Sequence, residues 1–186
     1  MALERGRVHE ACGTARRSFA LWLASCCKGP VLWISPAWEP EQLNPDGMRD
    51  FTDPARVLFL RASRAEDLLW SVEEALRAGA VPLVIADLPA PPALTPVRRM
   101  HLAAEQGGQV GQAPLGLLLT PGQGGAQGIE SRWSMVPAHS GTRRLWQLDR
   151  LRARTSSTRR WQIMQTAPGR GLELLSPTTE TVDEPA

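Results

Sequence analysis

A chain of 186 residues with a formal net charge of +2 is long enough for one domain with a sizeable core. No run approaches the roughly eighteen apolar residues of a membrane-spanning helix, and the charged first ten residues do not resemble a signal peptide. An odd number of cysteines without zinc-site spacing indicates neither a metal nor a disulfide framework, so we expect a reduced, cytoplasmic protein with no membrane contact; these cysteines are Cys12, Cys26 and Cys27.

Arginine carries almost all of the positive charge, with twenty arginines against one lysine. Eight arginines and one acid, Asp149, lie between Arg132 and Arg160, whereas the residues after Arg170 include four acids and no base. A basic segment before an acidic end is compatible with binding to nucleic acid or to an acidic partner. A genome that favours arginine codons explains the excess of arginine over lysine equally well.

The start of the chain predicts a strand, a glycine turn and a helix. The strand lies within residues 6–13, and the helix runs from Thr14, its expected N-cap, to Lys28. This order is typical of a phosphate-binding loop, which also needs several glycines, a lysine and a Ser or Thr. Gly13 is the one glycine in this turn, and the single lysine lies a helix length away. The outline of a phosphate loop is therefore predicted without its chemistry.

Strands and helices alternate through the middle of the chain. Apolar runs predict buried strands at residues 31–34, 57–60, 81–87 and 115–120, with an irregular segment at 35–53 and a flexible loop at 121–128. Ser63 and Glu66 form a capping box for a helix that ends at Gly79. A second helix begins at Thr95, as N-cap, and ends at Gly107-Gly108. This alternation predicts an α/β fold.

The last third of the chain changes to the period of strands. Short strands are expected at residues 132–136, 145–154 and 159–165, and residues 155–158 join the last two as a hairpin. From residue 166 onward the composition suits a disordered segment.

The order of these parts resembles the core of RecA. The segments 65–81 and 97–104 and the basic hairpin carry this resemblance. Within that superfamily, residues 69–77, Arg98-Arg99, Arg132-Trp133 and residues 151–154 before Trp161 are most similar to ImuA, the RecA-related accessory family of damage-induced mutagenesis and a relative of SulA. The resemblance implies a RecA-like three-layer sandwich with a mostly parallel central sheet and a C-terminal β-hairpin. Residues 1–165 would form a degenerate RecA-like core, and residues 166–186 a disordered acidic tail.

A RecA-type ATPase needs groups that this chain largely lacks. Asp87, at the end of a strand, matches the acid that organises Mg²⁺, although such an acid is more often a cap or turn residue. No base follows the strand at 31–34, and the strand at 115–120 ends in Thr120-Pro121 rather than in a polar sensor. The loops that match the DNA-binding loops of RecA, 88–94 and 121–128, contain no Lys, Arg or aromatic residue. We expect no ATP hydrolysis, no catalytic residue and no cofactor.

The remaining candidate site is basic. Arginines of the hairpin offer a contact for nucleic acid or a partner, and equally a charged edge that blocks strand pairing; they are Arg150, Arg152, Arg154, Arg159 and Arg160. The first three alternate, which predicts that they share one face of a strand. The histidines have no partner at motif spacing and are expected either to be satisfied by structural hydrogen bonds or to face solvent; they are His9, His101 and His139.

The resemblance implies an adaptor in the translesion synthesis of the SOS response to DNA damage. Its expected partners are RecA, an ImuB-like relative of Y-family polymerases and an error-prone polymerase, with DNA contact through the basic hairpin. One alternative is a SulA-like inhibitor of cell division. The other is a protein with residual ATP binding, in which Arg16 and Arg17 at a helix N-terminus replace the lysine.

Overall fold

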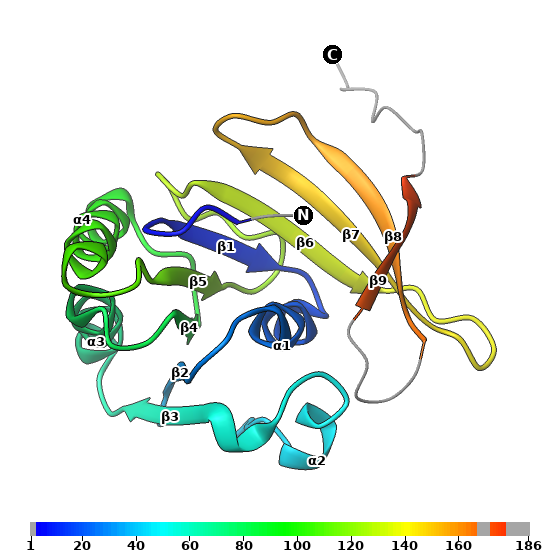
Figure 1. Cartoon of the computed structure of the whole chain (residues 1–186), viewed down its shortest axis with the longest axis horizontal. Coiled ribbons are helices and arrows are strands. Elements are labelled where there is room, and N and C mark those ends of the chain that lie inside the picture. The colour runs from blue at the N-terminus through cyan, green and yellow to red at the C-terminus, as the bar shows by residue number, and fades with distance from the viewer. Residues whose placement is uncertain (1–2, 167–171, 178–186) are drawn as a thin grey trace.

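The computed structural model describes residues 3–166 and 172–177 of the chain (Figure 1). It contains the helices α1 (Arg16–Cys26), α2 (Pro45–Met48), α3 (Ala65–Ala78) and α4 (Leu94–Val110), and a short 3₁₀ turn at Pro54–Arg56. Among residues 3–166 and 172–177, no helix combines the length and the apolar character needed to cross a membrane.

The strands form one mixed sheet. They are β1 (Val8–Cys12), β2 (Val31–Pro36), β3 (Val57–Ala62), β4 (Leu83–Asp87), β5 (Leu115–Leu119), β6 (Ser131–Pro137), β7 (Arg144–Ala153), β8 (Arg159–Gln165) and β9 (Leu172–Pro177). Their order across the sheet is β3-β2-β4-β5-β1-β6-β7-β8-β9. All pairs from β3 to β6 are parallel, and all pairs from β6 to β9 are antiparallel.

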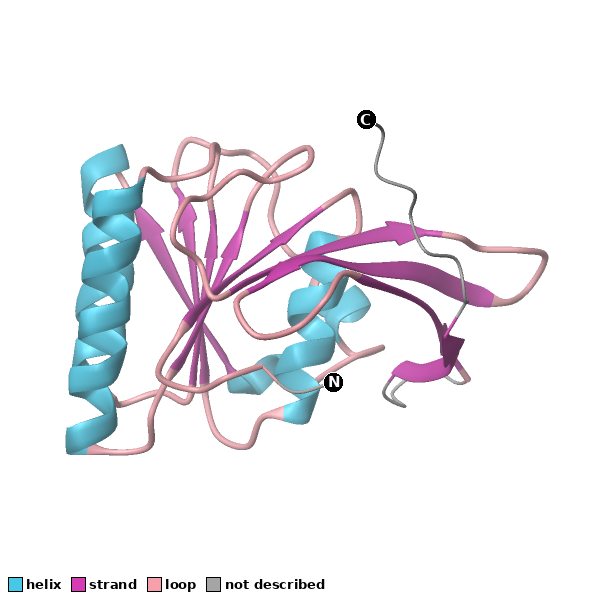
Figure 2. Cartoon of the chain, turned by 90° about the horizontal axis from the view of Figure 1, so that it is seen from above, coloured by secondary structure: helices cyan, strands magenta, loops and turns pink. Residues whose placement is uncertain are grey.

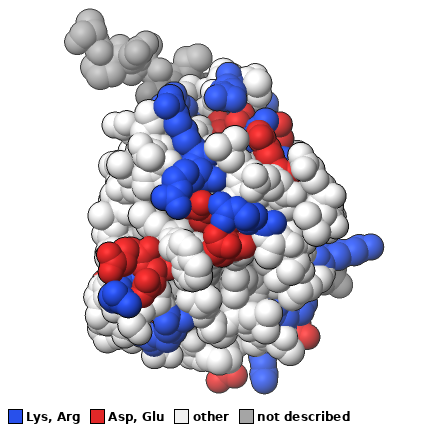
Figure 3. All heavy atoms as spheres, turned by 90° about the vertical axis from the view of Figure 1, so that its left-hand side faces the viewer, with Lys and Arg blue, Asp and Glu red and all other residues white. Residues whose placement is uncertain are grey.

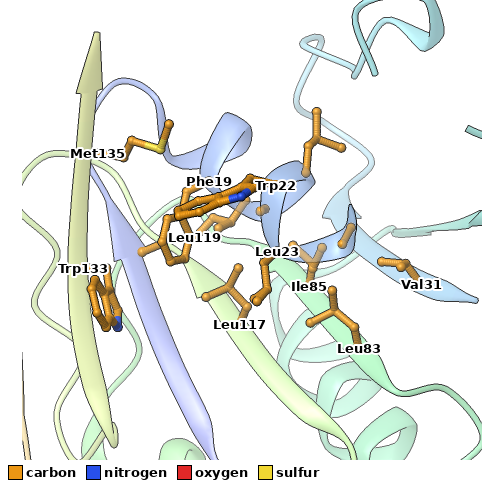
Figure 4. Packing of buried hydrophobic residues seen from close by; sticks show 14 of the residues in the cluster. Phe19, Trp22, Leu23, Val31, Leu83, Ile85, Leu117, Leu119, Trp133 and Met135 are labelled. Carbon is orange, nitrogen blue, oxygen red and sulfur yellow. The ribbon is translucent and has the colours of Figure 1, made fainter. Parts of the chain in front are cut away.

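Helices cover both faces of the parallel half, which gives three layers (Figure 2). On one face α1 packs its aromatic side chains against the sheet, and Phe19 stacks on Trp133 with ring centres 6.1 Å apart (Figure 4). On the other face α3 and α4 lie side by side over a second apolar cluster, which includes Val72, Leu76 and Met100. Because both faces are covered, β4 and β5 are buried along their whole length, as their continuous apolar sequences predict.

The predicted strands and helices are present, but three predicted N-caps are wrong, and α4 continues past its predicted end at Gly107-Gly108 to Val110. The N-cap residues are Ala15, Arg64 and Ala93, and no side chain caps them within the described chain. The start of α1 is held to a neighbouring strand, because the Ala15 N–H donates to the Met135 carbonyl at 2.9 Å. Gly79, with a φ of +61°, ends α3 as expected.

Two strands differ from prediction. β3 is the edge of the sheet rather than a buried strand, so Leu58 and Phe59 are 52% and 53% exposed. β9 lies within residues 166–186, where we predicted disorder, and it pairs with β8. The prediction is therefore wrong for residues 172–177, because this leucine-rich segment pairs with the edge of the sheet at β8. The rest of the predicted tail, except Thr166, lies outside the described residues.

Candidate functional site

The carboxyl ends of the parallel strands bring several of the predicted site residues to one edge of the sheet. Gly13 follows β1, Asp87 ends β4, and Thr120 follows β5. In open α/β sheets, ligands bind at this edge, where loops and helix N-termini meet. We therefore refer to it as the carboxyl edge and consider its groups in turn.

The glycine turn is used for packing. Gly13 has a φ of +83°, and a Cβ atom placed on it would lie 2.5 Å from the Met135 carbonyl oxygen of β6. The Gly13 N–H donates to the Gly122 carbonyl at 3.1 Å, and the Arg16 N–H donates to the Gly13 carbonyl at 3.3 Å. With Ala15 also bonded, three amides of the turn are occupied by carbonyls. A phosphate group would have to displace these bonds to bind there.

The charged groups of the carboxyl edge neutralise one another. Arg17 Nε donates to Asp87 Oδ2 at 2.6 Å, and Arg17 Nη1 donates to Glu41 Oε2 at 2.7 Å. Arg16 Nε lies 3.8 Å from Asp87 Oδ1 and is buried, with no hydrogen-bond partner in the described part of the chain. Burial opposes the charge of Arg17, yet its hydrogen bonds to Asp87 and Glu41 raise its pKa above the usual value. The acid predicted for Mg²⁺ thus binds the arginines predicted for phosphate.

A fully buried carboxylate holds the loop that follows β5. Oε1 of Glu10 accepts hydrogen bonds from Thr120 Oγ1 at 2.6 Å, Gly125 N at 2.9 Å and Ala126 N at 3.0 Å. Its Oε2 accepts the Nε–H of Arg132, whose Nη2 donates to the Ala126 carbonyl. Loop 121–128 is therefore tied to β1 and β6, contrary to the expected flexible loop. An acid inside a fully buried strand was the signal for this anchor, because a buried charge requires partners.

The histidines hold backbone and side-chain groups together, as expected of structural residues. His101 accepts the Val8 N–H at Nδ1 (3.3 Å) and donates from Nε2 to the Gly128 carbonyl (3.1 Å), so α4 is tied to β1 and to the loop end. His9 lies between the Glu4 carbonyl (2.9 Å) and the Ser131 hydroxyl (2.7 Å). Burial lowers the pKa of both His9 and His101.

His139 supports a different strand. Its Nδ1 accepts the Leu145 N–H at 3.0 Å, and its ring meets Trp146 edge to face. All three histidines therefore have hydrogen-bond partners in the structure, although no sequence motif links them to these partners.

The five candidate arginines of the hairpin do not form one patch. A bulge at Leu151 places Arg150 opposite Trp133 and Arg152 opposite Arg132. Because consecutive residues of β6 point to opposite faces, Arg150 and Arg152 also lie on opposite faces. The prediction of a shared face is wrong for this reason.

The five arginines also differ in their partners. Arg160 binds both carboxylate oxygens of Asp149, at 2.8 and 3.3 Å. Arg154 lies 3.9 Å from Glu130, and Arg152 is exposed. Arg150 and Arg159 are brought together over Trp161. Sequence spacing could not have separated these roles.

On the α3 and α4 side, acids are interleaved with arginines (Figure 3). Arg77 and Arg99 both bind Glu73, which bridges the two helices. A shallow groove beside α4 contains Arg7 paired with Glu105, and also His101 and Glu130. Most charge on this face is therefore internally balanced.

Two further observations bear on the candidate site: the grouping of possible metal ligands and the comparison with known proteins. Within residues 3–166 and 172–177, no three His, Cys, Asp or Glu side chains come together as a metal site. No protein-family model matches the sequence, and no curated protein matches it. The function is therefore proposed from the geometry of the chain and from the resemblance of its motifs.

Proposed function

We propose that this chain is a non-catalytic adaptor built on a RecA-type core, acting in the cytoplasm during damage-induced translesion DNA synthesis. It would act through protein contacts with RecA, an ImuB-like relative of Y-family polymerases and an error-prone polymerase. The observation that carries the proposal is the carboxyl edge, where Asp87 holds Arg17 at 2.6 Å and the amides of the Gly13 turn bind carbonyls.

The fold is compatible with this proposal. A mostly parallel sheet, covered by helices on both faces and continued by antiparallel strands, is what the resemblance to RecA implies. Because one fold can serve many functions, the groups of the carboxyl edge support the proposal more strongly than the fold does.

The groups at the carboxyl edge support the proposal that the chain does not hydrolyse ATP. Phosphoryl transfer requires cations and a metal aimed at the developing charge, and a group that orients the attacking water. At this edge the arginines are bound to carboxylates, and β2 ends in Ser35-Pro36 without an acid. Glu41, a nearby carboxylate, is bound to Arg17.

Exposed apolar side chains support action through protein contacts. Leu58 and Phe59 on the edge strand β3 and Trp70 on α3 are each more than half exposed. Leu58 and Phe59 are consecutive and so point to opposite faces, but both flank the edge strand of the sheet, and exposed apolar side chains are typical of sites where proteins associate. A partner surface on the β3 side of the molecule fits these residues.

Two measurements on the purified chain test the proposal. Isothermal titration with ATP and Mg²⁺ is expected to show no micromolar binding, and phosphate release is expected to stay at the level of buffer. Micromolar binding that Arg16→Ala and Arg17→Ala abolish would overturn the non-catalytic assignment in favour of residual ATP binding. The buried Nε of Arg16, which has no hydrogen-bond acceptor among the described residues, is the observation that favours this second candidate.

The partner is tested by pull-down. RecA and the polymerase-like proteins are expected to bind the wild-type chain, and a division GTPase is not. Phe59→Glu is expected to weaken capture of a partner at least severalfold, whereas Val110→Glu, at an exposed position at the end of α4, is the matched control. Capture of the division GTPase instead of RecA would favour the SulA-like alternative.

A further inference from the structure

Two arginines face each other on the antiparallel strands without an acid between them. Arg150 of β7 is paired directly with Arg159 of β8. Like charges in opposite positions of a sheet are destabilising, and proteins normally offset them with a nearby carboxylate. The nearest acid in the strand order, Asp149, belongs to the opposite face and binds Arg160. Neither Arg150 nor Arg159 has a carboxylate partner within residues 3–166 and 172–177.

Indole rings support these two arginines. Trp133 and Trp161 stack with ring centres 5.7 Å apart. The guanidinium carbon of Arg150 lies 5.7 Å from the ring centre of Trp133 and 5.4 Å from that of Trp161, and that of Arg159 lies 5.4 Å from Trp161. Arg150 is also oriented by its Nε–H, which donates to the Ser157 carbonyl at 2.8 Å. Cation–π contacts hold a guanidinium group in place without neutralising its charge.

We propose that this Arg–Trp surface, consisting of Arg150, Arg159 and Trp161, binds single-stranded nucleic acid, with the buried Trp133 supporting it from beneath. Two guanidinium groups that are ordered and still charged can bind phosphate oxygens through paired N–H donors. Unstacked bases pack on guanidinium planes and on aromatic rings, and this surface offers the guanidinium groups of Arg150 and Arg159 and the partly exposed ring of Trp161.

A single strand fits this surface better than a duplex or an acidic peptide. Bases in a duplex are already stacked on each other, so they cannot use the planar groups of the surface. A carboxylate-rich peptide would satisfy the charges but leave the planar groups without a stacking partner. The surface does not depend on the proposed adaptor role, because its binding is measured on this chain alone.

Fluorescence anisotropy with a labelled oligo(dT) strand tests the proposal. The wild-type chain is expected to bind the strand at least about threefold more tightly than a duplex of the same length. The double variant Arg150→Gln/Arg159→Gln is expected to lower the affinity at least about tenfold. It should also lower the slope of log affinity against log salt by about 1.4, since each phosphate contact to a single strand contributes about 0.7.

The matched control is Arg152→Gln, an exposed arginine of the same strand on the opposite face. It is expected to change the affinity less than twofold. An equal loss in the control would show attraction by overall charge and overturn the proposal, as would wild-type binding by the double variant. Displacement of the oligonucleotide by a glutamate-rich peptide at equal concentration would assign the surface to an acidic protein instead. Circular dichroism of each variant shows that the sheet is retained, and Arg159→Gln alone is the milder variant if the double one unfolds.

Discussion

At the carboxyl edge of the parallel strands arginines meet carboxylates, whereas on the antiparallel strands two arginines meet indole rings. Arg17 and Asp87 are 2.6 Å apart and satisfy each other's charge. Arg150 and Arg159 are held over Trp161 and keep their charge. In a salt bridge, the charge and the N–H donors of an arginine are used by the partner carboxylate. An arginine that lies on an aromatic ring keeps its charge and most of its N–H donors for a ligand. The comparison teaches that arginines at the carboxyl edge are paired with carboxylates, whereas Arg150 and Arg159 on the antiparallel strands rest on an indole ring.

The largest loss of unfolding free energy is expected at Glu10, the fully buried carboxylate of β1. Glu10→Ala removes the acceptor of Arg132, of Thr120 and of two amides at once. A buried cation left without its partner costs about 3–5 kcal/mol of unfolding free energy, measured by urea denaturation. Glu105→Ala, which breaks an exposed pair with Arg7, is the control and should cost below about 1 kcal/mol. Equal losses for the two variants would show that Glu10 is not an anchor.

The second effect tests whether the glycine turn serves packing. Gly13→Ala combines a left-handed backbone with a clash against the Met135 carbonyl, and should cost about 3 kcal/mol. Gly122→Ala has a similar φ of +61° but open space around the new methyl group, and should cost about 1 kcal/mol. Chemical denaturation of both variants separates the two contributions. If Gly13→Ala costs no more than Gly122→Ala, the turn is not packed against β6.

A smaller effect is expected for the Arg17–Asp87 pair. A double-mutant cycle with Arg17→Ala and Asp87→Ala should give a coupling free energy of about 1–2 kcal/mol, since Asp87 is buried and hydrogen-bonded. The exposed pair of Arg49 and Asp46, 3.8 Å apart, should couple by less than about 0.5 kcal/mol. A coupling near zero for the first pair would mean that Arg17 remains available for an anion.

The smallest effect is a dependence of stability on pH. Burial lowers the pKa of His9 and His101, so the folded chain takes up fewer protons than the unfolded chain, in which a histidine has a pKa of about 6.5. Stability from these groups is therefore present above that pH and is lost as the pH falls below it. The melting temperature should fall by a few degrees between about pH 7.5 and 5.5. His101→Gln should flatten the profile, and an unchanged profile would contradict this role.

Local sequence patterns predicted most of the elements. The apolar runs at 31–34, 81–87 and 115–120 became β2, β4 and β5, because a strand covered on both faces needs apolar side chains throughout. The sequence also predicted correctly that a glycine turn joins the first strand to the first helix. The predicted caps failed because the helices begin after Ala15, Arg64 and Ala93 instead. At α1 the chain is held by a bond from the Ala15 N–H to β6, more than a hundred residues away.

The sequence by itself determined the order of strands and helices along the chain, the single glycine of the first turn and the arginine-rich hairpin, since each depends on nearby residues. Only the tertiary structure decided which charges are paired. Glu10 reaches donors from residues 120–132, and Asp87 reaches the start of α1, through pairings that sequence distance hides. One bulge at Leu151 separated Arg150 from Arg152, because a single extra residue in a strand moves the following side chains to the opposite face.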